Sequence, residues 1–311
     1  MRTRTALILV LACFLLLYPL QNAIDQRRPK EDVIEQVLYL PSGQVVKAVS
    51  FGFDGILADI YWLRSVQYFG RQLLDEKGEF NWSRINLVRY DLLYPLLDIT
   101  TTLDPNYIAA YRFGAIFLPD YNHQQALSLL QKGIANNPNN WRLYQHLAMI
   151  YWQHNDYKLA SETFLKGGDI PTAPAWMKVM GGVMLTQGGD RKVACALYGT
   201  LYKEALESND QYVSSQMESQ IRRVHAIDEV DYLNKLIEKY KQAKGTCPNN
   251  LADLGPLLGL VSQEKGACGQ SVTIQLNEKR EPISPLGTVY RFDPKECKAK
   301  MPFDLYEPWA N

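Results

Sequence analysis

The middle third of the chain repeats its pattern of small and apolar residues at an interval of 34 residues. Three positions of the pattern recur, and they are occupied by Ala126, Ala160 and Ala194, by Leu130, Phe164 and Tyr198, and by Gly133 and Gly167. A fixed interval of this length is typical of stacked helical hairpins, none of which can bury its apolar face alone. We therefore expect three hairpins within residues 107–208.

A second set of aromatic and small residues precedes each of these segments. It comprises Tyr144, Leu147, Ala148 and Tyr151 in the middle unit, Tyr111, Gly114, Ala115 and Leu118 in the first, and Gly181, Gly182 and Leu185 in the third. With Pro105 and Pro138 ahead of the first two units, the pattern resembles the tetratricopeptide-repeat family. It departs from that pattern at Lys178, which stands at a usually aromatic position. The resemblance implies a right-handed curved array whose concave side is formed by the first helix of each pair.

Apolar periodicity continues on both sides of the repeats. Residues 83–103 predict a helix that Pro95 kinks or splits, and residues 53–68 predict its partner, so that 53–106 form an N-terminal helical pair. Residues 209–245 are expected to cap the array with two helices, at 211–226 and 230–243.

The last part of the chain, residues 246–311, predicts a small α+β module. A short helix entered through Pro248 is followed by two alternating segments, 272–276 and 289–293, with a turn at 285–287. The arrangement is similar to the tail of secretion pseudopilins, and no function is transferred from that similarity.

An unbroken apolar run from residue 6 to residue 20 follows Arg2 and Arg4. Extended to residue 24, it is long enough to cross a bilayer as a helix, so residues 1–24 predict a membrane anchor or a signal segment and 25–52 a linker. Cys13 offers a lipoprotein alternative. A short basic tail before an apolar run is the usual arrangement for export, so we expect the rest of the chain outside the membrane, in the periplasm of a bacterium.

Composition and charge narrow the classes of partner. The chain has 311 residues, of which 47% are hydrophobic and 21% charged, so it can bury a substantial core. Its 33 basic and 33 acidic residues give a formal net charge of zero, so no excess positive charge attracts the chain to nucleic acid. Membrane-associated proteins are the expected partners, with membrane contact through residues 6–24.

The cysteines allow two interpretations. Three of them, Cys247, Cys268 and Cys297, lie in the C-terminal part, and Cys195 lies in an apolar helical stretch. A disulfide between two of the first three would suit an exported module, whereas reduced thiols throughout are equally compatible. None of the spacings is typical of a metal site.

Catalytic motifs are absent from the sequence. His123, His146, His154 and His225 are scattered, and no nucleophile elbow, phosphate loop or dinucleotide fingerprint occurs. Asp228-Glu229 is interpreted as a pair of charges at a helix start. We expect no enzymatic activity, no cofactor, no metal and no small-molecule substrate.

Binding is the function that remains. In the family's packing, a mixed set of polar and apolar residues faces the concave groove, namely Arg112, Gln145, Met149, Trp152 and Gln153. This lining suits an extended peptide or a partner helix. Alternatively, Trp152 packs against the neighbouring hairpin.

These features favour a membrane-tethered scaffold that assembles a membrane or envelope complex. An alternative is an integral structural subunit of one large membrane complex, which exposed aromatic area at Tyr61-Trp62 and Tyr68-Phe69 would favour. A third possibility is an enzyme without a recognisable motif, which would need a deep polar pocket.

Overall fold

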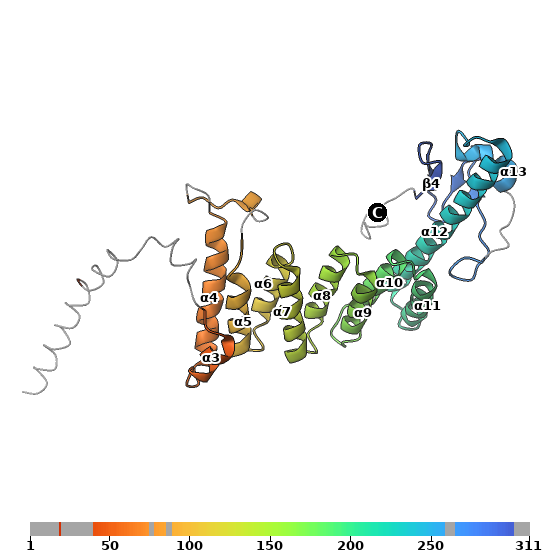
Figure 1. Ribbon diagram of the computed structural model, residues 1–311. Coiled ribbons are helices and arrows are strands. Elements are labelled where there is room, and N and C mark those ends of the chain that lie inside the picture. The colour runs from red at the N-terminus through yellow and green to blue at the C-terminus, as the bar shows by residue number, and fades with distance from the viewer. Residues whose placement is uncertain (1–18, 20–39, 75–77, 85–88, 259–264, 302–311) are drawn as a thin grey trace, which may run out of the picture.

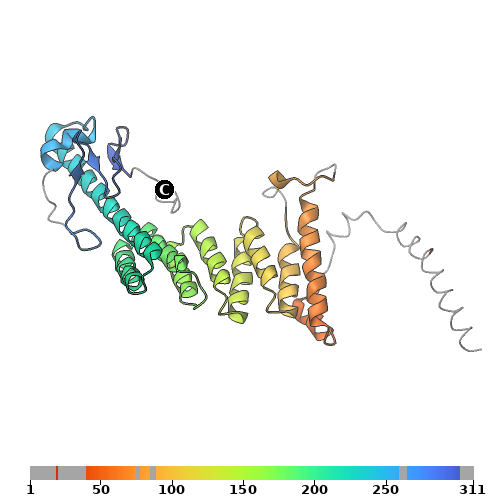
Figure 2. The same cartoon turned by 180° about the vertical axis from the view of Figure 1, so that it is seen from behind.

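The protein is mostly helical, with short antiparallel strand pairs near its C-terminus, as the sequence predicts (Figure 1). The computed structural model describes residue 19 and residues 40–74, 78–84, 89–258 and 265–301. The helices form an elongated array that runs from α4 at one end to α12 at the other, and the view from behind shows the same order (Figure 2).

The array begins with two helices that pack on a third. α3 (Gly43–Ala48) lies inside the segment that was predicted to be a linker, so that prediction is wrong for these residues. Ser42 caps α3 by accepting a hydrogen bond from the amide of Val45, and Val46 packs into the cluster around Ala58 of α4 (Asp54–Gln72). The first part of the chain is therefore folded onto the array from residue 40.

The predicted helix at 83–103 begins later than expected. A short 3-10 turn, η1, covers Trp82–Arg84, residues 85–88 lie outside the described residues, and α5 spans Leu93–Leu103. Pro95 lies in the first turn of α5, where its missing N–H removes no intrahelical hydrogen bond. α5 packs against α4, as the predicted helical pair requires.

Three helical hairpins follow, each made of two consecutive helices. Their bounds are α6 (Ile108–Phe117) and α7 (His123–Asn136), α8 (Trp141–Gln153) and α9 (Tyr157–Gly168), and α10 (Trp176–Gln187) and α11 (Arg191–Glu207). The 34-residue pattern places one Ala and one Leu or aromatic residue in each of α7, α9 and α11. All six of these residues are fully buried. The interval in the sequence thus marks equivalent positions in the packing.

The repeat extends to the turns inside the second and third hairpins. Asn155 and Gly189, 34 residues apart, both have left-handed backbones, with φ of 62° and 89°. The amide of the following residue, Asp156 or Asp190, donates to the carbonyl five residues earlier at 2.9 and 2.8 Å. The two hairpins therefore turn in the same way, although their residues differ.

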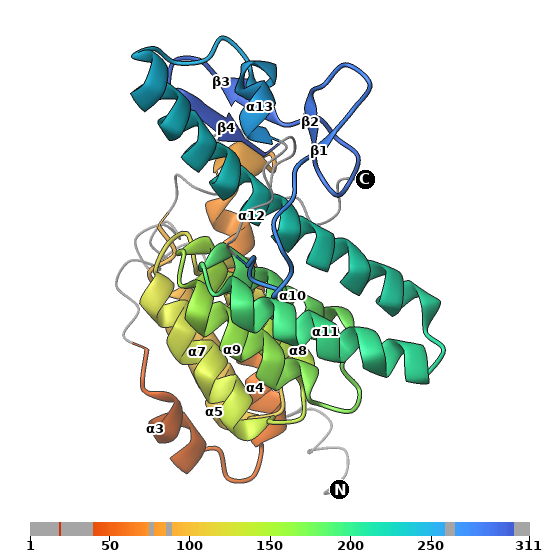
Figure 3. The same cartoon turned by 90° about the vertical axis from the view of Figure 1, so that its right-hand side faces the viewer.

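α12 (Gln211–Lys244) is one helix, not the two predicted. Asp228 and Glu229, interpreted from the sequence as helix-start charges, lie in its middle. The carboxylate of Asp228 accepts hydrogen bonds from Arg191 and from the amide of Ala267, and that of Glu229 accepts one from Tyr290. At about 1.5 Å per residue, α12 is about 50 Å long, so it carries the C-terminal module away from the hairpins (Figure 3).

The C-terminal module packs on the second half of α12. It contains η2 (Leu251–Leu254), α13 (Gly255–Leu258), β1 (Gln275–Leu276), β2 (Pro282–Ile283), β3 (Arg291–Asp293) and β4 (Lys298–Lys300). β1 pairs with β2 and β3 with β4, both antiparallel. Only the ends of the two predicted strand segments are strands, and their partners β2 and β4 were not predicted. Leu233, Leu236 and Ile237 of α12 form a cluster with Leu254 and Tyr290.

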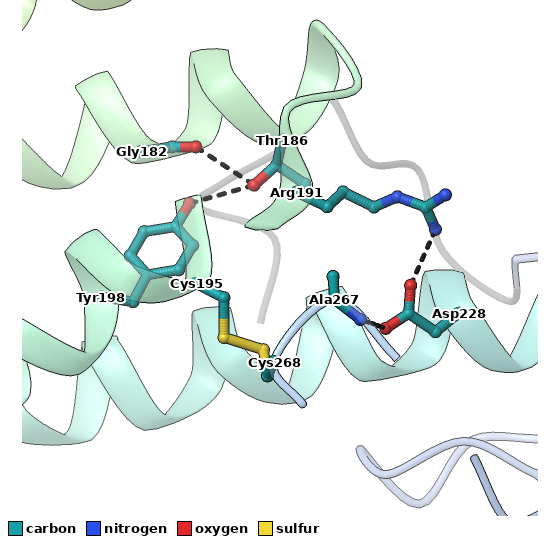
Figure 4. The surroundings of a disulfide bond; sticks show 8 residues. All are labelled: Gly182, Thr186, Arg191, Cys195, Tyr198, Asp228, Ala267 and Cys268. Carbon is teal, nitrogen blue, oxygen red and sulfur yellow. Dashed lines mark hydrogen bonds and ion pairs between the residues drawn. A yellow bond between two sulfur atoms is a disulfide. The ribbon is translucent and has the colours of Figure 1, made fainter. Parts of the chain in front are cut away.

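Two disulfides fasten this end of the chain. Cys247 pairs with Cys297 inside the module, which is one of the pairings allowed by the sequence. Cys268 pairs with Cys195 of α11, a residue that the sequence analysis left out of the candidate set (Figure 4). The second bond ties the module to the third hairpin.

Within the described part of the chain, no helix has both the length and the apolar character needed to cross a membrane. The predicted anchor lies outside that part except for Pro19, as do Cys13 and residues 25–39 of the predicted linker.

Candidate protein-binding site

The five predicted groove residues lie on the first helices of the first two hairpins. Arg112 on α6 and Gln153 at the end of α8 are exposed, while Gln145, Met149 and Trp152 on α8 are half-buried. Met149 and Trp152 pack against a buried cluster that includes residues of α9 and α10. Trp152 is therefore packed at the edge of a cluster that spans the second and third hairpins, and it is only partly exposed.

Arg112 lies close enough to His146 to change its titration. Burial lowers the pKa of His146, and the positive charge of Arg112 on the neighbouring helix lowers it further. His146 on α8 therefore loses its proton more readily than an ordinary histidine, and Arg112 is the nearby charge that stays exposed.

A mostly apolar recess among these helices was not predicted. A cavity of about 300 Å³ lies between α10 and the start of α12. We call it the α10–α12 cavity, and it is lined by Pro174, Ala175, Trp176, Val179, Met180, Val183, Asp210, Tyr212, Val213, Gln216 and Gln220. Its size is sufficient for one or two bulky side chains.

A signal for this cavity is present in the sequence. Val179 and Val183 lie 34 residues after Gln145 and Met149, so they occupy the equivalent first-helix positions of the third hairpin. The sequence analysis did not extend the groove to them because the third unit departs from the family pattern. The far wall, from α12, could not be identified without the fold.

Aromatic contacts connect the cavity with the second hairpin. The rings of Trp141, at the start of α8, and Trp176, at the start of α10, meet edge to face with centroids 6.0 Å apart. The guanidinium of Arg142 lies 4.5 Å from the Trp141 ring. The two indole rings and the guanidinium of Arg142 therefore join the start of α8 to the cavity wall.

A second cavity, of about 510 Å³, lies where α11, α12 and the C-terminal module meet. Arg191 at its wall binds Asp228 at 2.9 Å and Asp231 at 2.7 Å (Figure 4 draws the first of these pairs). These two ion pairs join α11 to α12, and Asp228 also accepts a hydrogen bond from the amide of Ala267, so we assign these groups to holding the module on the array. In the described residues, no three His, Cys, Asp or Glu side chains are grouped to hold a metal.

Two histidines that are distant in sequence bring their rings into tilted contact between neighbouring hairpins. The ring centroids of His123, at the start of α7, and His154, at the end of α8, are 3.6 Å apart. Burial lowers the pKa of His123, and so does the charge that His154 carries when protonated. The sequence analysis treated these two histidines as scattered because their 31-residue separation matches no local motif.

The aromatic residues whose exposure would favour an integral structural subunit are mostly covered. Tyr68 and Phe69 are buried, and Tyr61 and Trp62 pack against the same core, so these four residues give that alternative no support. A different apolar surface is exposed at this end of the array. We call it the N-terminal apolar face, and it consists of Val45, Val49, Phe51, Phe53, Ile56, Ile60 and Leu63.

Comparison with known proteins gives no match to a family model, to a curated protein or to a solved structure.

Proposed function

We propose that this protein is a membrane-tethered scaffold that binds a segment of another protein on the first-helix side of its array. The observation that carries the proposal is the α10–α12 cavity, whose wall is formed by Val179 and Val183 at the positions equivalent to Gln145 and Met149. A partner segment with one bulky apolar side chain would fill this cavity, and buried apolar anchors of this kind contribute most of the binding energy in protein interfaces.

The surroundings of the cavity favour a peptide segment over a small molecule. Gln216 and Gln220 at its wall, and Gln145 and Gln153 on α8, offer amide donors and acceptors for a partner's backbone. Arg112 adds an exposed cation farther along the same side. An extended row of apolar and amide groups matches the length of a partner helix or an extended peptide.

An exported location fits the cysteines. Two disulfides join four of the five cysteines, and disulfides persist mainly in oxidising compartments such as the bacterial periplasm. The proposed arrangement is therefore an anchor within residues 1–24 and an array outside the membrane that gathers components of a membrane or envelope complex.

A pull-down from mild detergent tests this function. The full-length tagged protein is compared with Val179→Arg, which places a charge at the cavity wall, and with Tyr212→Ala, which removes a side chain that is 67% exposed. Leu206→Arg is the matched control, because Leu206 is exposed on α11 and does not line the cavity.

The proposal expects a partner that is retained by the wild type and by Leu206→Arg and is lost from both cavity variants with helicity unchanged. Retention of the same stoichiometric partners by all four proteins would instead support the integral structural subunit. Absence of any co-purifying protein would contradict both.

A further inference from the structure

α4 has apolar residues on two opposite sides. Its inner side, with Ala58, Tyr68 and Phe69, packs into the array. On its outer side, Ile56, Ile60 and Leu63 follow one another at intervals of four and three residues and are 60%, 41% and 56% exposed. Terminal units of helical arrays usually carry a polar outer face, so an apolar stripe here is a surface that another component covers.

The turn between α3 and α4 extends this stripe. Val45 and Val49 of α3 are exposed, Phe53 is 62% exposed and Phe51 is 89% exposed. Phe51 has a left-handed backbone, with φ of 50°, and is followed by Gly52 with φ of 86°. A bulky residue adopts this conformation rarely, and here the turn leaves an aromatic ring in solvent. Seven exposed apolar residues thus lie on α3, on the turn and on the outer side of α4 at this end of the array.

We infer that the N-terminal apolar face lies against the surface of the membrane in which the protein is anchored. The inference rests on the proposed tether. A membrane anchor in the same chain makes the bilayer, rather than another protein, the expected contact of this face. The predicted membrane segment ends at residue 24, and the described array begins at Leu40, which packs against the cluster containing Val46 and Ala58. The fifteen residues between them span at most about 50 Å when fully extended, so this end of the array stays near the bilayer.

Basic and acidic side chains both border the face, and three further basic residues precede it in the sequence. Lys47 and Arg64 are exposed beside it, and Arg27, Arg28 and Lys30 lie in the preceding segment of the sequence. Asp59 is exposed on the same side of α4 and accepts a hydrogen bond of 3.0 Å from the hydroxyl of Tyr107, and Asp54 is half-buried. Apolar side chains that insert beneath basic ones are the usual pattern of interfacial binding.

α10 and α12, which line the α10–α12 cavity, lie toward the opposite end of the array from α3 and α4 (Figures 1 and 2). With the N-terminal apolar face on the bilayer, the array extends away from the attachment point and the cavity remains open to a partner. The two surfaces therefore serve different contacts, one with lipid and one with protein.

Quenching by labelled lipids tests this placement in the full-length chain. In a Cys13→Ser background, the four other cysteines are joined in disulfides, so a thiol introduced by Val49→Cys takes a single environment-sensitive fluorophore. The protein is reconstituted into vesicles of phosphatidylethanolamine and phosphatidylglycerol that carry spin-labelled acyl chains. Leu206→Cys on exposed α11 supplies the control label.

The inference expects loss of fluorescence from the label at position 49 and none from the label at position 206. It also expects Phe51→Ser with Ile56→Ser to abolish the quenching at position 49 while the protein still floats with the vesicles. Flotation without quenching at position 49 would overturn the inference but leave the tether intact, and would assign the face to a partner protein or a second copy. Failure to float would overturn the tether itself.

Discussion

The hydroxyl of Tyr290 donates a hydrogen bond of 2.7 Å to Oε2 of Glu229, and both side chains are buried between α12 and the C-terminal module. Burial raises the pKa of Glu229 from 4.5 to about 7, with a smaller contribution from the charge of Asp228, although the Tyr290 hydrogen bond opposes the shift. The module is therefore attached to α12 through a carboxyl group that resists ionisation.

The sign of the resulting pH dependence follows from the raised pKa. The folded state binds this proton more tightly than the unfolded state, so the stability due to Glu229 is complete below pH 4.5 and is lost as the pH rises toward 7. Glu229→Gln keeps an acceptor for Tyr290 and removes the charge. We expect thermal unfolding of the variant at pH 8 to show a gain of up to about 3 kcal/mol over the wild type. At pH 4.5 the two proteins should be equal, and a variant that is less stable at pH 8 would contradict the assignment.

Breaking the bond between Cys195 and Cys268 should loosen the module from the third hairpin. The two cysteines are 73 residues apart, and closing a loop of that length in the unfolded chain corresponds to about 4 kcal/mol of stabilisation. In Cys195→Ala with Cys268→Ala, we expect faster hydrogen exchange in residues 265–273 and unchanged exchange in α6 to α9. Cys13→Ala is the control. Equal exchange with and without the bond would show that packing alone holds this segment.

Gly133 allows the two helices of the first hairpin to approach each other closely. A Cβ atom at this position would lie 2.8 Å from the ring of the fully buried Tyr111, which cannot move aside. Gly133→Ala should lower the free energy of unfolding by about 1–3 kcal/mol in denaturant titrations. Gly199→Ala is the matched control inside α11, because no atom lies within 4 Å of the added carbon, and it should stabilise by about 0.5–1 kcal/mol. A neutral Gly133→Ala would mean that the hairpin packs less tightly than described.

The contact between α6 and α8 can be detected through His146. The pKa of this residue is lowered first by burial and then by the charge of Arg112. Arg112→Gln should raise the pKa of His146, measured by NMR titration of the imidazole, while burial still keeps it below 6.5. Arg142→Gln, on the same helix as His146, should leave the titration unchanged. An unchanged pKa in Arg112→Gln would place the two side chains apart.

Local packing explains what could be predicted from the sequence. Ala126, Ala160 and Ala194 recur at 34 residues because each hairpin makes the same contacts with its neighbour, so their burial follows from the interval alone. The side chains of Asp228 and Glu229 were misinterpreted because their partners Arg191, Ala267 and Tyr290 are about 40 to 60 residues away.

The candidate surfaces were harder to predict for the same reason. The α10–α12 cavity needs Val179 and Tyr212, which come together only when α12 folds back on α10. The N-terminal apolar face depends on which side of α4 has no neighbour, and a hydrophobic pattern cannot distinguish Ile56 on the outside from Ala58 on the inside before the packing is known.

Site-specific photo-crosslinking of the full-length protein in its own membrane tests the central claim most directly. A benzophenone amino acid is placed at Tyr212 beside the cavity, at Gln153 on α8, and at Leu206 on α11 as the control. The account predicts that the first two positions form adducts with the same partner protein, that Leu206 forms none, and that Val179→Arg removes the adduct at Tyr212. Equal crosslinking at all three positions, or none at Tyr212 and Gln153, would contradict it.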